Sequence, residues 1–249
     1  MLIRQGEERD SRLDRRLAFT LASVAGAINA AAFHAVGFFS ANMTGNVSSV
    51  SNLVALGQWA HGLGYLVVVL AFIGGAMVST LMISAGLRRG ATGIYAQIVI
   101  AEAALLALLG AATMNLDRAA GVPILVLGLS FLMGLQNAIV TRISDARIRT
   151  THVSGMSTDI GIELADLLNV KRGKTDSTNR LSLESKLLLH VGTVICFLTG
   201  GVAGVVGYVT VGDAAFVLAA IPLLFVAVPS LVRSTRQQSS AASAPPEAL

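Results

Sequence analysis

The sequence predicts an all-α polytopic integral membrane protein. It has about six transmembrane helices, arranged as two inverted three-helix repeats that each hold a polar re-entrant half-helix. Of its 249 residues, 54% are hydrophobic and only 13% are charged, with a mean hydropathy of +0.71. An ordinary soluble domain is about a quarter charged. The apolar residues gather into six long runs, and two polar segments recur in matching places between them.

Each apolar run has about 18 to 24 residues, close to the ~20 that cross a bilayer as a helix. Only helices and closed barrels satisfy every backbone polar group in lipid, and long continuous runs indicate helices. The six predicted spans cover residues 17–36, 62–85, 94–114, 122–140, 187–209 and 214–232.

A cleaved signal peptide is the alternative interpretation of residues 17–36, because basic residues precede this run and small residues lie near its end. Its length and its place in the repeat described below favour a retained span. The single cysteine, Cys196, lies inside an apolar run and is expected to pack there, so no disulfide framework is predicted.

Basic residues are segregated among the connecting segments. With the N-terminus in the cytoplasm, 17 of the 18 Lys and Arg residues fall on the cytoplasmic side and only Arg118 falls outside. Positively charged loops stay in the cytoplasm, which predicts six spans in the cell inner (plasma) membrane with both termini cytoplasmic. Because of this segregation, the net charge of +4 does not indicate nucleic-acid binding.

The first polar segment, residues 40–56 (SANMTGNVSSVSNLVAL), carries no charge. Gly45 permits a turn, and Thr and Asn side chains can bond free backbone groups. The apolar residues that follow recur at roughly helical spacing. Residues 151–168 (THVSGMSTDIGIELADLL) repeat this plan. Each segment is predicted to be a short helix that enters the protein without crossing the membrane.

Matching motifs indicate that the chain contains two copies of one unit. Residues 26–30 (GAINA) match 134–138 (GLQNA), 43–45 (MTG) match 153–155 (VSG), and 72–75 (FIGG) match 198–201 (LTGG). Because each unit has three spans, the copies have opposite orientations, as in many secondary transporters. Chance similarity among Gly- and Ala-rich helices is the alternative.

The two units are expected to cover residues 17–116 and 122–233, between cytoplasmic tails at residues 1–16 and 234–249. The connection over residues 169–186 is polar. The tail from residue 233 onward is rich in Ser, Ala and Pro and is expected to be disordered.

Several of these motifs stand in a characteristic order: residues 43–46 (MTGN), 134–138 (GLQNA), 151–155 (THVSG) and 158–161 (TDIG). This combination resembles the YoaK-like family of bacterial membrane proteins, the domain of unknown function 1275. The resemblance extends from about residue 17 to residue 232, with Ser154 in place of an expected Thr. It implies a six- or seven-span inner-membrane protein and supplies no substrate.

Uncharged polar residues in and beside the two segments are candidates for a solute site. Asn29 and Asn137 lie within spans, where an amide needs a hydrogen-bond partner, so they either hold helices together or line a site. A helix N-terminus suits an anion or a carboxylate, although an ordinary N-cap is the alternative. The full set is Asn29, Asn42, Thr44, Gly45, Asn46, Asn137, His152, Ser154, Gly155 and Thr158.

Three acidic residues are candidates for a proton or cation site. Glu102 lies well inside a span, where an ionisable group is expensive and is a functional candidate by default. Asp159 and Glu163 lie one turn apart on one helical face, for which a solvated face or pairing with nearby Arg residues is the alternative. We expect Glu102 to exchange a proton and Asp159 to be the better cation ligand. The sequence carries no metal or cofactor motif, so neither is expected.

These features favour a secondary transporter or permease of a small solute, working by alternating access with a proton or a cation. An enzyme is not expected, although a membrane-embedded enzyme using His152 with Asp159 or Glu163 is the main alternative. A channel or a structural membrane scaffold is a third interpretation. Two polar segments that reach one central cavity would favour transport, whereas a paired His152 and Asp159 in a cavity open only to the cytoplasm would favour catalysis.

Overall fold

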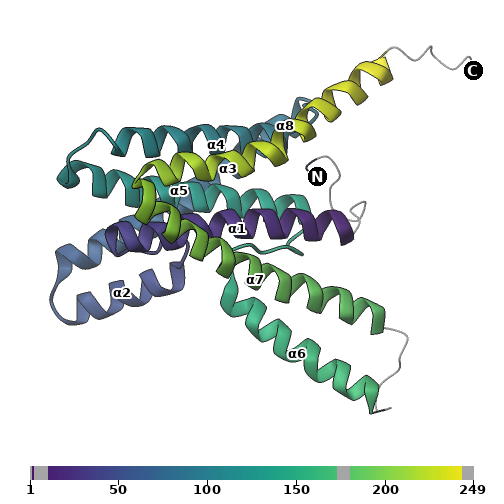
Figure 1. Ribbon diagram of the computed structural model, residues 1–249, viewed down its shortest axis with the longest axis horizontal. Coiled ribbons are helices and arrows are strands. Elements are labelled where there is room, and N and C mark those ends of the chain that lie inside the picture. Colours follow the sequence, from purple (N-terminus) through teal and green to yellow (C-terminus); the bar gives the residue numbers. More distant parts are fainter. Residues whose placement is uncertain (1, 3–10, 173–179, 243–249) are drawn as a thin grey trace, which may run out of the picture.

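A computed structural model describes residue 2, residues 11–172 and residues 180–242, and this part of the chain is all-helical. Six of its helices are long and apolar enough to cross a membrane, which confirms the predicted class of polytopic membrane protein. Figure 1 shows the helices in chain order: α1 (Ser11–Val36), α2 (Met43–Ala55), α3 (Trp59–Arg88), α4 (Ile94–Thr113), α5 (Arg118–Ser144), α6 (Val153–Lys171), α7 (Arg180–Val211) and α8 (Ala214–Ala242).

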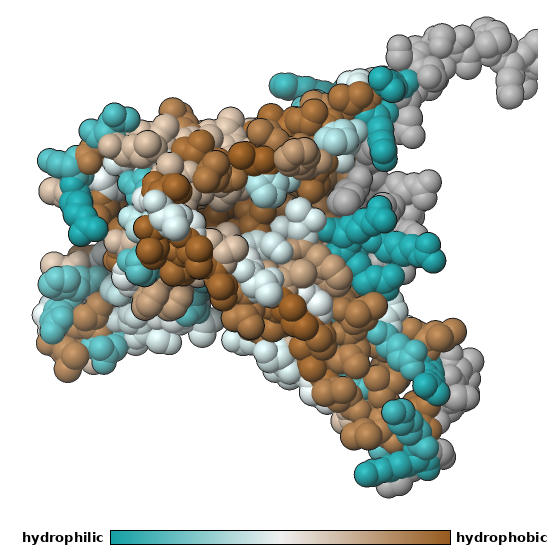
Figure 2. Space-filling view, viewed as in Figure 1, coloured by the Kyte–Doolittle hydropathy of each residue, from teal (hydrophilic) through white to brown (hydrophobic). Residues whose placement is uncertain are grey.

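The surface carries the polarity that a membrane protein needs. In Figure 2, hydrophilic residues gather toward the two ends of the molecule and apolar residues cover the middle. The start of α1 and the end of α8 lie at the same end (Figure 1), as an even number of spans requires. An apolar belt between polar ends is the surface that a bilayer covers.

The two polar segments form α2 and α6. With 13 residues, α2 is about 20 Å long, too short for a hydrocarbon core of about 30 Å. The longer α6 is not among the six apolar spans. Both helices begin in the central part of the molecule and diverge toward opposite ends, α2 to the left and α6 to the lower right of Figure 1.

Several helices extend beyond their apolar runs. The tail expected to be disordered from residue 233 is helical as far as Ala242, so that prediction is wrong for these residues. Ala, Gln and Arg are good helix formers, and α8 continues through them. The polar connection predicted at residues 169–186 is helical at both ends, since α6 continues to Lys171 and α7 begins at Arg180. Residues 173–179 and 243–249 lie outside the described part.

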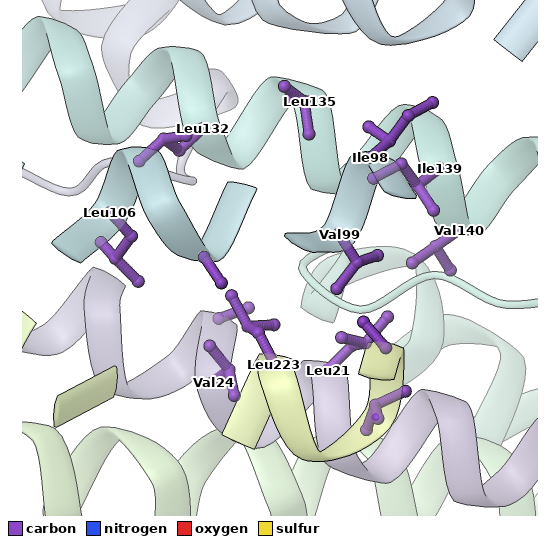
Figure 3. Packing of buried hydrophobic residues seen from close by; sticks show 14 of the residues in the cluster. Leu21, Val24, Ile98, Val99, Leu106, Leu132, Leu135, Ile139, Val140 and Leu223 are labelled. Atoms are coloured by element: carbon purple, nitrogen blue, oxygen red, sulfur yellow. The ribbon is translucent and has the colours of Figure 1, made fainter. Parts of the chain in front are cut away.

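The apolar core lies among α1, α4, α5 and α8. Side chains from all four helices meet there, including Val24 of α1, Leu106 of α4, Leu132 of α5 and Leu223 of α8 (Figure 3). In α1, α4 and α5, half or more of the apolar 18-residue stretch that could span the membrane is buried, compared with 22% in α3 and 11% in α7. Thus α3 and α7 flank the core and direct much of their apolar surface outward.

Glycines allow two pairs of helices to cross in close contact. A Cβ added at Gly26 of α1 would overlap the backbone of Phe197 in α7, and one at Gly134 of α5 would overlap the backbone of Phe72 in α3. Small residues are the usual means of close helix approach in membranes. Each crossing joins the first half of the chain to the second, and the short helices pack on the crossing partners, α2 on α3 and α6 on α7.

The glycine contacts at these crossings also correct the sequence alignment of the two halves. A Cβ at Gly75 would overlap the Phe131 backbone, and one at Gly200 would overlap the Ser23 backbone. These equivalent contacts pair Gly75 with Gly200, whereas the sequence alignment pairs Gly74 with Gly200. The alignment is therefore shifted by one residue in this span, because neighbouring glycines offer no sequence signal for the one that meets the opposite helix.

Candidate functional site

A cavity of about 700 Å³ lies where α2 and α6 begin. Both halves of the chain contribute to its wall, and several of its residues form equivalent pairs. Asn29 pairs with Asn137, Asn42 with His152, Thr44 with Ser154, and Phe72 with Phe197. The two polar segments thus reach one shared central cavity.

Each asparagine fixes the chain that precedes a short helix. The side-chain oxygen of Asn29 accepts a hydrogen bond of 2.8 Å from the backbone N–H of Ala41. That of Asn137 accepts one of 2.7 Å from the hydroxyl of Thr151. Ala41 and Thr151 each lie two residues before their helix begins. The asparagines therefore position the helix starts and face the cavity as well.

The N-termini of the two short helices differ in one respect. Asn42 caps α2, since its side-chain oxygen accepts a 3.1 Å hydrogen bond from Gly45 N–H. His152, at the same position before α6, makes no capping hydrogen bond with its side chain. Its Nδ1 instead lies 3.2 Å from Nη1 of Arg149. The first turn of α6 therefore presents backbone N–H groups beside a guanidinium group.

The described part of the cavity wall carries positive charge. Arg149 is charged, and among the described residues that line the cavity there is no Asp or Glu. At the equivalent position before α2, three residues ahead of the N-cap, stands Phe39. With two helix N-termini contributing partial positive charge, the site suits an anion.

A second cavity, of about 110 Å³, lies on the other side of Arg149. Its wall includes Arg147, Asp159 and His190 as well as Arg149, so Arg149 faces both cavities. His190 also approaches Glu163, with 3.0 Å between Nδ1 and Oε1. No sequence motif marks His190 as a candidate, because its pairing with Glu163 depends on how α6 and α7 face one another.

The other candidates in the polar segments shape the helices rather than the cavity wall. Asn46 is buried and its amide donates to Phe39 O at 3.4 Å. Gly155 lies close to the ring of His152. Thr158 is exposed, and its hydroxyl donates to Ser154 O at 3.2 Å. Gly45 lies against the Asn42 side chain that caps it.

Glu102 lies apart from both cavities. It is 1% exposed in α4, and its Oε1 accepts a 2.8 Å hydrogen bond from Nε2 of Gln136 in α5. It is not part of either cavity wall. Its position fits a buried polar contact between two core helices.

The sequence motifs do not mark Arg149 or the three phenylalanines of the cavity wall, Phe39, Phe72 and Phe197, as candidates. On sequence grounds Arg149 is only a possible partner for the nearby acids, although it stands two residues before the second polar segment. Phe72 and Phe197 lie in apolar runs, where an aromatic residue gives no signal of its own. Their equivalence at the two glycine crossings becomes visible only in three dimensions.

A family model described as "Protein of unknown function (DUF1275)" matches residues 17–229. The match covers most of the chain and confirms the resemblance inferred from the motifs. No match was found among curated proteins or solved structures.

Proposed function

Since the chain belongs to the DUF1275 family, whose function is unknown, we propose from the cavity geometry that it is a secondary transporter or permease of a small organic anion. One observation carries the proposal. Two short helices that run toward opposite ends of the molecule begin at a single cavity, which equivalent residues of both halves line. In inverted-repeat transporters, broken helices present their N-termini to an anionic substrate near the membrane midplane.

The helix contacts support an inverted repeat. In such a repeat α1 corresponds to α5 and α7 to α3, so the α1–α7 crossing corresponds to the α5–α3 crossing. In each crossing a glycine, Gly26 or Gly134, meets the backbone of a phenylalanine, Phe197 or Phe72, on the other helix. The pairs α2–α3 and α6–α7 correspond in the same way. Such a frame can open the cavity to either side by rocking one unit against the other.

The chemistry of the cavity wall favours an organic anion. Arg149 and the first turn of α6 offer charge-assisted and backbone hydrogen bonds to an oxyanion. Phe39, Phe72 and Phe197 supply an apolar wall on which a hydrocarbon or aromatic group can pack. The ligand class is therefore a small carboxylate or sulfonate that carries an apolar part.

The geometry gives less support to the alternatives. A membrane-embedded enzyme of the kind considered above needs His152 and Asp159 together. His152 lines the central cavity and contacts Arg149, whereas Asp159 lines the smaller cavity. A channel differs from a transporter in its kinetics, because flux through an open pore does not saturate at low solute concentration.

The segregation of basic residues sets the proposed orientation, with both termini and the α6–α7 connection in the cytoplasm. In this orientation α2 reaches the cavity from outside and α6 from the cytoplasm. The membrane is the cell inner (plasma) membrane, and the anion moves together with a proton, for which a site is derived below.

Ligand binding to the purified protein in lipid nanodiscs tests the proposal. We expect benzenesulfonate, benzoate or acetate to raise the thermal midpoint at constant ionic strength, because a ligand that binds the folded state stabilises it. Neutral benzamide and cationic benzylamine serve as controls of similar shape and should give no shift. If no anion of the panel stabilises the protein, or if benzylamine does so equally, the proposed anion site is wrong.

Arg149→Gln should weaken benzenesulfonate binding by about tenfold or more, since a hydrogen bond to a charged group contributes roughly 1.5–3 kcal/mol. Arg142→Gln is the matched control: it removes the same charge from an exposed residue near the end of α5 that does not line the cavity. Its dissociation constant should stay within about twofold of the wild-type value.

A further inference from the structure

We propose that the Glu163–His190 pair, with the small cavity beside it, is a proton-binding site coupled to anion binding in the central cavity. The inference rests on the proposed transport function and adds the driving ion to it. It also assigns proton binding to different residues from those that the sequence favours.

The pair links the second short helix to its neighbouring span. Nδ1 of His190 in α7 lies 3.0 Å from Oε1 and 3.2 Å from Oε2 of Glu163 in α6. The side chains are 8% and 19% exposed for Glu163 and His190, so the contact is largely shielded. An imidazole takes up and releases a proton near neutral pH. Protonation of the imidazole converts its hydrogen bond to the carboxylate into an ion pair and tightens the link between α6 and α7.

Arg149 connects this pair to the solute site. His190 and Arg149 both line the small cavity, and Arg149 lines the central cavity as well. A guanidinium group disfavours a second positive charge nearby. An anion bound at Arg149 cancels that effect and thereby favours a proton on His190. The coupling is reciprocal, so a proton on His190 favours anion binding to the same degree.

The elements packed against the pair carry other charged groups. Helix α6 carries Asp159 and Asp166, α7 carries Lys186, and the segment before α6 carries Arg147 and Arg149. On α1, Asp14 lies 3.9 Å from Arg147, and Arg15 donates a hydrogen bond of 3.4 Å to Ser185. Asp166 and Lys186 are exposed, where solvent screens them.

These surroundings favour a proton over a metal cation. The two arginines that line the small cavity oppose a second cation there. The described residues also contain no group of three or more His, Cys, Asp or Glu that could hold a metal ion. A proton needs no such coordination shell, because one imidazole nitrogen suffices to bind it.

The site belongs to one half of the chain only. Leu53 follows the start of α2 by ten residues, as Glu163 follows the start of α6. Tyr65 precedes Gly75 by ten residues, as His190 precedes Gly200. The first half thus has an apolar residue and a phenol where the second half has a carboxylate and an imidazole. In the proposed orientation, the proton site faces the cytoplasmic side of the central cavity.

Calorimetric titration of the nanodisc-embedded protein with benzenesulfonate tests the coupling. This probe keeps its charge near neutral pH, so any proton exchange belongs to the protein. Titrations at about pH 7 in buffers of different ionisation enthalpy report the protons taken up per anion bound. We expect fractional uptake in the wild type and none in His190→Gln. Glu163→Gln should reduce the uptake, because the imidazolium loses its carboxylate partner.

His61→Gln is the matched control, since His61 belongs to the equivalent helix α3 and does not line the central cavity. It should keep the wild-type proton uptake, as should Glu102→Gln. Retained uptake in His190→Gln, or loss of uptake in Glu102→Gln, would overturn the assignment. Binding without proton uptake in the wild type would overturn the coupling alone, whereas no binding heat would contradict the proposed function as well. If His190→Gln does not fold, Glu163→Gln decides the question, because unchanged uptake in that variant would overturn the assignment as well.

Discussion

Asn29 and Asn137 have the same structural role in the two halves of the chain. Each accepts a hydrogen bond from the segment just before a short helix, and each also lines the central cavity. An irregular segment at membrane depth is tolerated where protein buries it or where it lines a cavity. The asparagines meet this requirement and fix the position of the helix N-termini at the same time.

Asn137→Ala removes the acceptor for Thr151 and should loosen the start of α6. We expect a loss of about 1 kcal/mol in stability, together with weaker benzenesulfonate binding. Asn115→Ala is the control, because this exposed amide donates to the Ala111 carbonyl of its own turn at 2.8 Å and lines neither cavity. Thermal midpoints and dissociation constants measure both effects. Equal behaviour of the two variants would show that Asn137 has no special role.

The sequence reveals these asparagines because an amide inside an apolar run stands out. It does not reveal the pairing of Glu163 with His190, since the hydrogen bond depends on the relative rotation of α6 and α7. Glu102 shows the converse case. Its place inside a span makes it a strong candidate on sequence grounds, but the carboxyl group bonds Gln136 away from both cavities.

Among the helices, the close crossings of α1 with α7 and of α3 with α5 tie the two halves together. Hydropathy predicts the spans themselves but not these partners. In α3, Gly75 and Ser79 are buried while Leu70 and Met77 are exposed. A lipid-facing surface is as apolar as a packed one, so the interface is marked by small residues instead.

Adjacent glycines in α3 provide a direct test of the crossing. A Cβ at Gly75 would overlap the Phe131 backbone, whereas at Gly74 nothing lies within 4 Å. Gly75→Ala should therefore destabilise the protein by about 2 kcal/mol or more, as overpacking does. Gly74→Ala should be neutral or should stabilise the helix by up to about 1 kcal/mol. Thermal unfolding in nanodiscs measures both, and the reverse order would refute the α3–α5 contact.

For the whole molecule, the proposed orientation rests on the basic residues and the even number of spans. Single cysteines introduced in a Cys196→Ser background test it. A reagent that cannot cross membranes should label Gln58→Cys in intact cells, because the proposed orientation places the turn between α2 and α3 outside. It should label Arg89→Cys, between α3 and α4, only after the membrane is opened. The opposite pattern would invert the topology.

Uptake of radiolabelled benzenesulfonate into proteoliposomes tests the central claim most directly. A permanently charged sulfonate crosses a bare bilayer poorly, so accumulation reports the protein. With the outside more acidic than the inside, we predict saturable accumulation that disappears when the pH gradient is collapsed and falls strongly in Arg149→Gln. Protein-free liposomes define the background. Uptake no faster than this background, or uptake that neither saturates nor responds to the pH gradient, would contradict a proton-coupled transporter of small organic anions.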